Sequence, residues 1–229
     1  MSGAEIAKPW KHLPCEVHPV PYYRTSCALI ALSTDIVIEN EFRSLSRDDL
    51  LALRSSISEA ARIVISQDPL DVVAVGCAAA AMAIGPDELH RLVREARPGV
   101  KVTDPVSACL AVFASKSITK IAIVTPYPDD VNEGIERFYE QHGIKIVAKA
   151  SFKRPGGEDI SRIDPQSILE AATEIGTASE AECVLLSCTA LRSRGILREA
   201  GITLEKPVFS SNSALAWHVR QLSDAGDLS

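Results

Sequence analysis

The chain has 229 residues, enough for one large domain or two small intertwined ones, with 46% hydrophobic residues, 24% charged residues and a formal net charge of −6. An acidic balance without a block of like charge argues against nucleic acid or an anionic membrane as a partner, and no apolar stretch reaches the ~18 residues of a membrane span. The first ten residues lack the apolar core of a signal peptide, so we expect a cytoplasmic protein.

Strand-like and helix-like segments alternate along the whole chain. Most strand candidates are continuous apolar runs, as expected when both faces of a parallel sheet are covered. They lie at 27–32, 71–76, 100–103, 120–125, 144–150, 182–187 and 207–210. Amphipathic stretches of helical period lie between them, at 48–67, 86–97, 105–116, 128–142, 165–178, 190–200 and 212–222. This order predicts an α/β fold with mainly parallel sheets.

The pattern of elements repeats once along the chain. Residues 25–117 and 118–220 each carry an opening strand and helix, a strand that ends in a cysteine, and a closing strand and helix. We therefore expect two similar halves. The division we predict places 25–117 together with 211–229 in the first half and 118–210 in the second.

Each half carries one cysteine directly after a buried strand. Residues 71–81 and 182–192 share an apolar run, a small residue, and then Cys77 or Cys188. We expect a helix to begin after each cysteine, where N–H groups and the macrodipole favour a thiolate. Two such thiols facing each other across one cleft suggest proton or carbon chemistry on a small anion without a cofactor. A buried structural role is the alternative for any single cysteine.

The remaining cysteines are expected to have no catalytic role. Cys27 and Cys183 lie within strands, and Cys109 lies on a helix face, so we interpret these three as core residues. An even number of cysteines does not predict disulfides in a long chain without a secretion signal. No Cys or His cluster has the spacing of metal ligands, so we expect no metal.

Ligands in open α/β sheets bind beyond the carboxyl ends of the strands, and this rule selects further cleft residues. Tyr127 could hydrogen-bond a carboxylate or enolate oxygen, and the N–H and hydroxyl of Thr189 could bind an anion. Asp35 and Asn212 have a simpler alternative as helix caps, and Tyr127 as a surface residue of a turn. The candidate substrate-binding residues are Ser33, Thr34, Asp35, Ala78, Tyr127, Thr189 and Asn212.

From about residue 28 to 222 the sequence resembles the Asp/Glu racemase superfamily, in particular its maleate isomerase and arylmalonate decarboxylase branch. The resemblance rests on segments 187–192 and 206–217, on 121–127 with Asn132, and on 75–77. It implies two pseudosymmetric flavodoxin-like halves, each a mainly parallel sheet flanked by helices, with the active site between them. It also implies that Cys77 and Cys188 are catalytic and that no metal, flavin or pyridoxal phosphate is used.

Two details bear on which reaction and substrate the resemblance implies. Arylmalonate decarboxylases keep only the second cysteine, so two cysteines favour isomerisation or racemisation. The maleate isomerase loop that resembles 32–39 uses an asparagine to bind a substrate carboxylate, whereas Asp35 would repel a carboxylate and suit an ammonium or amidinium. Segments 31–35 and 158–163 are similar to ectoine-utilisation proteins, a subgroup of this branch. Ectoine-type substrates carry both a carboxylate and an amidinium. An ectoine-type substrate is therefore an alternative to a maleate-like one.

We therefore expect a cofactor-independent isomerase or racemase that acts on a small carboxylate, which in the ectoine-type alternative also carries a cationic group. Decarboxylation of a malonate-type substrate and non-catalytic binding of a small molecule are the alternatives. We expect a homo-oligomer, either a dimer or a tetramer.

Overall fold

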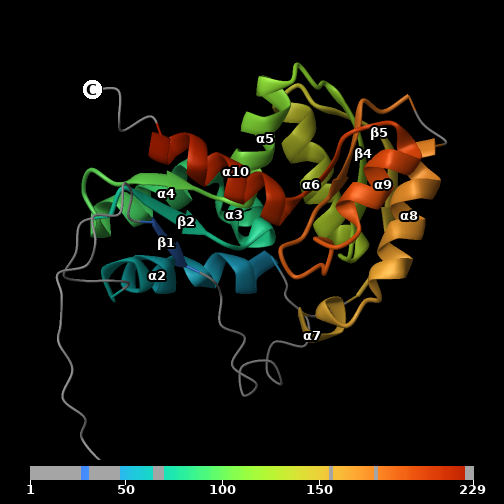
Figure 1. Ribbon diagram of the computed structural model, residues 1–229. Helices are drawn as coiled ribbons and strands as arrows, with labels where there is room; N and C mark the ends of the chain where they lie inside the picture. The colour runs from blue at the N-terminus through green and yellow to red at the C-terminus, as the bar shows by residue number, and fades with distance from the viewer. Residues whose placement is uncertain (1–26, 31–46, 64–69, 155–156, 178–179, 225–229) are drawn as a thin grey trace, which may run out of the picture.

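The computed structural model describes residues 27–30, 47–63, 70–154, 157–177 and 180–224 (Figure 1). Its strands agree with the expected strands to within one residue at each described end. They are β1 (Cys27–Ile30), β2 (Val72–Val75), β3 (Lys101–Thr103), β4 (Lys120–Thr125), β5 (Lys145–Ser151), β6 (Cys183–Leu186) and β7 (Val208–Ser210). The helices are α2 (Arg47–Ile63), α3 (Ala78–Ile84), α4 (Pro86–Ala96), α5 (Pro105–Ser115), α6 (Asp129–Gln141), α7 (Gly157–Ser161), α8 (Pro165–Thr177), α9 (Leu197–Leu204) and α10 (Ser211–Asp224).

The strands form two separate parallel sheets. The first has the order β1-β2-β3, and the second has the order β5-β4-β6-β7. The central strands β2 and β6 are buried at every position, which explains their unbroken apolar sequences. Consecutive strands β4 and β5 pair, and β6 then returns to the other side of β4. The order of the second sheet therefore reverses between β4 and β6.

Local sequence signals set the starts of several helices. Pro86 and Pro105 occupy first-turn positions of α4 and α5, where the missing N–H costs nothing. The Asp104 carboxylate caps α5 by accepting from the N–H groups of Val106 and Ser107. Gly85 links α3 to α4 with a φ of 91°, a left-handed conformation that glycine adopts without strain.

One helix differs from its expected position. The predicted helix at 190–200 is wrong in its first seven residues, because α9 begins only at Leu197. The chain between β6 and α9 instead makes short turns, with the Ser193 N–H donating to the Leu191 carbonyl and the Ile196 N–H donating to the Ser193 carbonyl. Leu191 and Ile196 are both buried, so this segment follows the core rather than a helical path. Cys188 is consequently not at a helix N-terminus.

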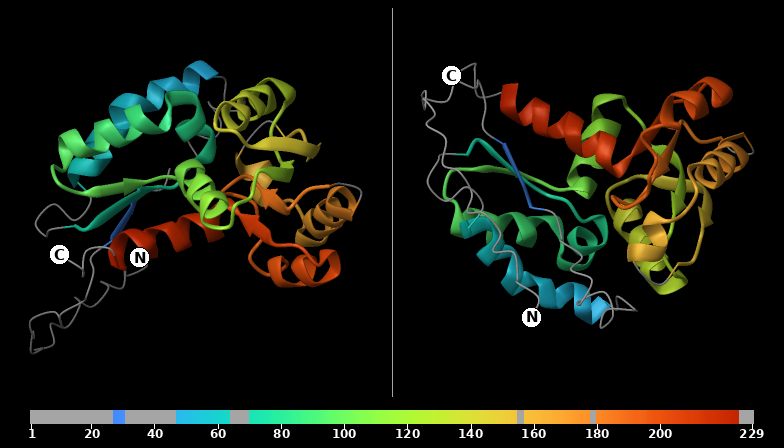
Figure 2. Two further views of the ribbon diagram at one scale, coloured as in Figure 1. Left: turned by 90° about the horizontal axis from the view of Figure 1, so that it is seen from above. Right: turned by 60° about the horizontal axis from the view of Figure 1, so that its bottom comes forward.

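The last helix joins the two halves. Helix α10 follows β7 of the second sheet, yet it packs against α5, β2 and β3 of the first half. Figures 1 and 2 show it running from the second sheet along the first, towards the C-terminus. In Figure 2 the first sheet lies between α2 and α4 on one side and α10 on the other. Helix α3 also contacts α6, which gives the halves a second contact.

No helix in the described part of the chain is both long and apolar enough to cross a bilayer. The candidate residues Ser33, Thr34 and Asp35 lie outside the described residues, as does the end of the first expected strand at 31–32.

Candidate active site

Cys77 is the N-cap residue of α3. It lies two residues after β2, and its extended backbone lets the thiol sulfur accept a hydrogen bond from the Ala80 N–H at 3.4 Å. The helix that it caps begins with four buried alanines, Ala78 to Ala81. The thiol sulfur thus lies against the first turn of a helix whose first four side chains are small. The expectation of a helix after the first cysteine is therefore confirmed.

Cys188 lies two residues after β6 and is 5% exposed. Its sulfur accepts a hydrogen bond from the Ala190 N–H at 3.4 Å, and the Leu191 N–H also stabilises its charged form. These donors come from the turn at 189–196 rather than from a helix. The turn thus supplies N–H groups to the sulfur without a helix macrodipole.

Tyr127 brings a hydroxyl to the second cysteine. It lies two residues after β4, at the point where the order of the second sheet reverses, and its hydroxyl hydrogen-bonds the Cys188 sulfur. The Tyr127 carbonyl accepts hydrogen bonds from the Asn132 amide at 2.8 Å and from the Ser151 hydroxyl at 2.5 Å. The tyrosine is 9% exposed, so the alternative of a surface turn residue is wrong.

The two thiols and the phenol form one electrostatic cluster. Ionised Cys188 raises the pKa of Cys77, and charge on either cysteine raises the pKa of Tyr127. The residues beside the thiols also touch, because the Thr189 hydroxyl donates to the Gly76 carbonyl at 3.1 Å. The fold thus brings the ends of β2, β4 and β6 together from both halves.

Burial dominates the ionisation of both thiols. Desolvation raises the pKa of Cys77 to about 11, against the N–H donors of α3, although the residue is only half-buried. Desolvation also raises the pKa of Cys188, and the Tyr127 hydroxyl and two N–H groups partly offset it. Burial therefore disfavours the resting thiolate that the sequence predicts. The Cys188 thiolate is stabilised by the Tyr127 hydroxyl in addition to two N–H groups, whereas Cys77 is stabilised by two N–H groups of α3.

Thr189 and Asn212 lie at this site with their polar groups engaged. The Thr189 hydroxyl donates to the Gly76 carbonyl, and the Asn212 amide donates to the Thr189 carbonyl at 2.9 Å. Neither Ser211 nor Asn212 is the capping side chain of α10. That role belongs to Ser210 and Ser213, whose hydroxyls each accept a hydrogen bond from the other's N–H.

Cys109 and Cys183 lie in the core, whereas the side chain of Cys27 lies outside the described part of the chain. Cys109 is 1% exposed and Cys183 is fully buried, and desolvation raises the pKa of each thiol to about 12. Their interpretation as core residues is confirmed. Among the residues that the structure describes, no group of three or more His, Cys, Asp or Glu side chains could hold a metal ion.

Sequence reasoning missed a buried polar cluster after β3. The Asp104 carboxylate accepts from the Ser107 hydroxyl at 2.6 Å and hydrogen-bonds the His90 imidazole at 2.8 Å. The His218 ring of α10 hydrogen-bonds the Thr103 hydroxyl next to it. The serine bonds the carboxylate rather than a histidine, so this is not the order of a hydrolytic triad. The sequence Thr-Asp-Pro at 103–105 signals the helix cap but not the two histidines.

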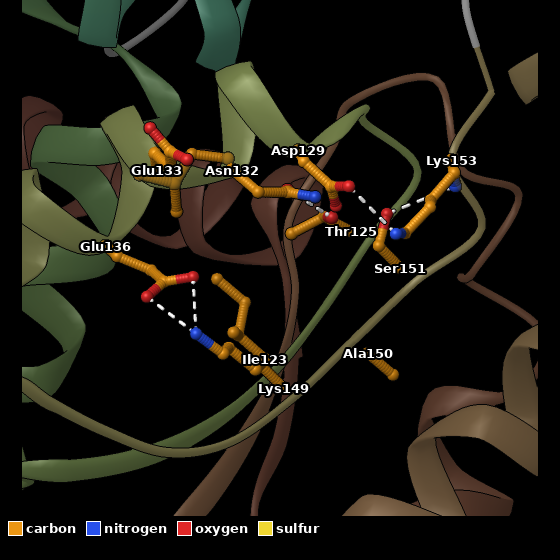
Figure 3. Close-up of a pocket in the computed structure, with 11 residues that line it drawn as sticks. Ile123, Thr125, Asp129, Asn132, Glu133, Glu136, Lys149, Ala150, Ser151 and Lys153 are labelled. Carbon is orange, nitrogen blue, oxygen red and sulfur yellow. Dashed lines mark hydrogen bonds and ion pairs between the residues drawn. The ribbon is translucent and has the colours of Figure 1, made fainter.

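A separate cavity of about 340 Å³ opens between α6 and the strands β4 and β5 (Figure 3). Four of its charged side chains pair with one another, Lys149 with Glu136 and Lys153 with Asp129, and Glu133 pairs with Arg137 outside the lining. Thr125 and Asn132 line it and hydrogen-bond each other at 2.6 Å. Neither Cys77 nor Cys188 lines this cavity. We place the candidate active site at the two thiols, because they are the reactive groups that the fold brings together, and treat the cavity as separate from it.

Residues 45–227 match the protein-family model described as arylmalonate decarboxylase. Arylmalonate decarboxylase of Bordetella bronchiseptica is 27% identical over 135 residues, which cover 58% of this chain and 56% of that protein. The chain thus aligns with little more than half the length of this relative. Maleate isomerase of Geobacillus stearothermophilus is 21% identical over 169 residues, which cover 71% of this chain and 67% of that protein.

Solved structures of both kinds of enzyme have a similar fold. A liganded double mutant of arylmalonate decarboxylase aligns with a TM-score of 0.76 at 21% identity, covering 87% of this chain and 92% of that one. A Nocardia farcinica maleate cis-trans isomerase mutant with a covalently bound succinylcysteine intermediate also aligns with a TM-score of 0.76. Its identity is 15%, and the alignment covers 87% of this chain and 93% of that one. These likenesses confirm the predicted fold of two parallel-sheet α/β halves.

Proposed function

Because the chain belongs to the arylmalonate decarboxylase family, we propose that it is a cofactor-independent isomerase or racemase of a small carboxylate. The two thiols, Cys77 and Cys188, are the catalytic residues of this proposal. The family match confirms the resemblance to the maleate isomerase and arylmalonate decarboxylase branch. The choice of reaction within that branch is part of the proposal.

One observation carries the proposal. Cys77 and Cys188 follow equivalent strands of the two halves, and they interact electrostatically with each other and with Tyr127. Two thiols on opposite sides of a substrate can act as base and acid, which a single thiol cannot do. The N–H groups around them, including that of Ala78, would stabilise the carboxylate or the enediolate that forms from it.

Proton transfer is the first of two routes. The Cys188 thiolate removes the α-proton, the electron pair moves into the carboxylate as an enediolate, and the Cys77 thiol protonates the opposite face. The configuration is then inverted, with the proton on Cys188 and the negative charge on Cys77. The Tyr127 hydroxyl, which hydrogen-bonds Cys188 and stabilises its thiolate, supports these roles.

Thiolate addition is the second route, for a substrate with a C=C bond next to its carboxylate. The thiolate of Cys77, the more exposed of the two residues, bonds to one carbon, and the pair of the double bond moves into the carboxylate. The carbon–carbon axis rotates, and elimination restores the double bond in the other geometry. Cys188 donates and recovers the proton. The Nocardia farcinica isomerase with its succinylcysteine intermediate supports a route of this kind.

Two substrate classes remain within this proposal. A maleate-like dicarboxylate is supported by the relative from Geobacillus stearothermophilus. An ectoine-type substrate, with a carboxylate and an amidinium, is supported by Asp35, because a carboxylate attracts a cation and repels a second carboxylate. In the ectoine alternative the Asp35 carboxylate would contact the amidinium of the substrate, and Ser33 and Thr34 remain substrate-binding candidates beside it.

Decarboxylation is the second candidate function. The family model and the Bordetella bronchiseptica relative favour it, since both carry the name arylmalonate decarboxylase. The presence of two interacting thiols favours isomerisation or racemisation instead. A binding protein without catalysis would need neither thiol, and replacing them would leave its ligand affinity intact.

The experiment is incubation of the protein in heavy water with maleate, aspartate, hydantoins, arylmalonates and ectoine derivatives. Solvent deuterium at the α-carbon with loss of optical activity supports proton transfer. Geometric isomerisation through a Cys77 adduct seen by mass spectrometry supports addition, and release of carbon dioxide supports decarboxylation. Cys77→Ser and Cys188→Ser should each lower turnover by about 10²–10⁴-fold, the usual contribution of a positioned acid or base.

Two matched controls sharpen this test. Cys109→Ser and Cys183→Ser replace buried thiols outside the site and should not lower turnover selectively at equal folded fraction. Full activity in either Cys77→Ser or Cys188→Ser would contradict a two-thiol mechanism. Turnover of a dicarboxylate that rises in Asp35→Asn would support the ectoine-type interpretation of the native site.

A further inference from the structure

A chain of hydrogen bonds connects the two cysteine segments across the two halves. The Thr189 hydroxyl donates to the Gly76 carbonyl at 3.1 Å, between positions separated by 113 residues. Gly76 directly precedes Cys77, and Thr189 directly follows Cys188. A single hydrogen bond therefore joins the peptides next to the two thiols.

Both ends of this hydrogen bond are held by further contacts. The Gly76 N–H donates to the Ile30 carbonyl at 2.7 Å, which extends the pairing of β1 with β2. The Thr189 carbonyl accepts from the Asn212 amide at 2.9 Å. Asn212 lies in the first turn of α10, whose cap is supplied by Ser210 and Ser213. The series thus runs from β1 through both cysteine segments to α10.

We propose that Thr189 is a positioning residue, whose hydroxyl holds the two cysteine segments in register across the halves. A hydroxyl has one proton, and this one is donated to Gly76, so the group has no proton left for a substrate carboxylate. The inference rests on the proposed function only for the catalytic role of the two thiols. Misplacement of reacting groups by about 1 Å can lower the reaction rate by about 10²-fold. A hydrogen bond between the peptides next to the two thiols should therefore affect the rate of the chemical step.

The test compares Thr189→Val, which keeps the shape and removes the hydroxyl, with Thr189→Ser, which keeps the hydroxyl. Thr189→Val should lower kcat by about 10–100-fold with KM within about two-fold, and Thr189→Ser should restore most of kcat. Thr173→Val is the matched control. It removes a hydroxyl that donates to the Leu169 carbonyl at 2.8 Å within α8, and it should leave both constants unchanged.

A second measurement needs no turnover. A bifunctional thiol reagent such as dibromobimane becomes fluorescent when it bridges two neighbouring thiols, and peptide mass spectrometry locates the bridge. We expect a Cys77–Cys188 bridge in the native protein and in Thr189→Ser and Thr173→Val, with a lower yield in Thr189→Val. Asn212→Ala, which removes one exposed donor to Thr189, should lower the yield in the same direction.

The outcomes separate this inference from the proposed function. If no substrate is turned over but bridging still depends on the hydroxyl, the proposed function fails and the positioning role stands. A Thr189→Val protein with native kcat and native bridging would overturn the positioning role. A rise in KM with unchanged kcat and unchanged bridging would also overturn it, because the hydroxyl would then contact the substrate. Should Thr189→Val not fold, native bridging in Asn212→Ala counts against the inference.

Discussion

At the scale of single residues, the chemistry of the site depends on the balance between burial and hydrogen bonding at two sulfurs. Burial raises the pKa of both thiols, while the Tyr127 hydroxyl and nearby N–H groups act against it at Cys188. Tyr127 is itself buried, and this desolvation raises its pKa well above the ordinary value, so the hydroxyl stays protonated at neutral pH and can donate a hydrogen bond. The Tyr127 hydroxyl hydrogen-bonds Cys188 and not Cys77, so it lowers the pKa of one thiol and leaves the other without this stabilisation.

Tyr127→Phe tests this distinction. A hydrogen bond to a charged group contributes about 1.5–3 kcal/mol, and 1.4 kcal/mol corresponds to ten-fold. Without it the pKa of Cys188 should rise, and its alkylation by iodoacetamide at neutral pH should slow by about ten-fold or more. The measurement is the pH dependence of alkylation of the Cys188 peptide by mass spectrometry, with Tyr139→Phe as control. An unchanged pH profile would contradict the role given to Tyr127.

The same experiment reports on Cys77. In Cys188→Ser the charge that raises the pKa of Cys77 is absent, so that pKa should fall below its native value of about 11. It should stay above the ordinary 9.0, because desolvation is the largest cause of the shift. Alkylation of Cys77 should then begin at lower pH than in the native chain.

At the scale of elements, close packing behind β6 supports the strand that leads to Cys188. Gly176 near the end of α8 faces β6 and α9. A Cβ placed there would lie 2.7 Å from Leu204 Cδ1 and 2.9 Å from Val184 Cγ2. Contacts this short require the Leu204 and Val184 side chains to shift, and both are buried in the core. The missing side chain of Gly176 therefore lets α8 pack closely against Val184 of β6 and Leu204 of α9.

Gly176→Ala should lower the free energy of unfolding by about 1–3 kcal/mol, the usual cost of overpacking. Gly134→Ala is the matched control, because Gly134 lies inside α6 and a Cβ there meets nothing within 4 Å. It should instead stabilise the protein by about 0.5–1 kcal/mol through helix propensity. Denaturant unfolding measures both variants. Equal stability of Gly176→Ala and Gly134→Ala would mean that the neighbouring side chains move aside at no cost, which would contradict the overpacking.

At the scale of the whole molecule, two features join elements that are distant in the sequence. One is helix α10, and the other is the buried polar cluster of Asp104 with His90, Ser107, Thr103 and His218. The packing of α10 on α5, β2 and β3 favours the division into 25–117 with 211–229 and 118–210, which stays a prediction. Within this packing, burial lowers the pKa of His218, and the charge of Asp104 partly offsets it. Burial acts to raise the pKa of Asp104, but hydrogen bonds from His90 and Ser107 outweigh it and leave that pKa lowered.

These shifts predict two losses of stability in acid. The pKa of His218 is lower in the folded state than its usual 6.5, so the unfolded chain binds more protons as pH falls below about 6.5 and stability declines. The lowered pKa of Asp104 adds stability above 3.8 that is lost as pH falls through its folded value. Denaturant unfolding from pH 7 to pH 3 measures both. His218→Asn should weaken the first decline and keep the second, and an unchanged first decline would contradict this assignment.

The sequence by itself determined the order of strands and helices, the parallel sheets and the position of both cysteines after buried strands. These features depend on local periodicity and composition, which are read directly along the chain. Only the tertiary structure decided that Cys188 lies in a turn, that the Thr189 hydroxyl bonds Gly76, and that both thiols are desolvated. The same is true of Asn212, whose amide reaches Thr189 instead of capping α10. Each of these outcomes depends on contacts between distant segments, and local sequence preferences do not contain them.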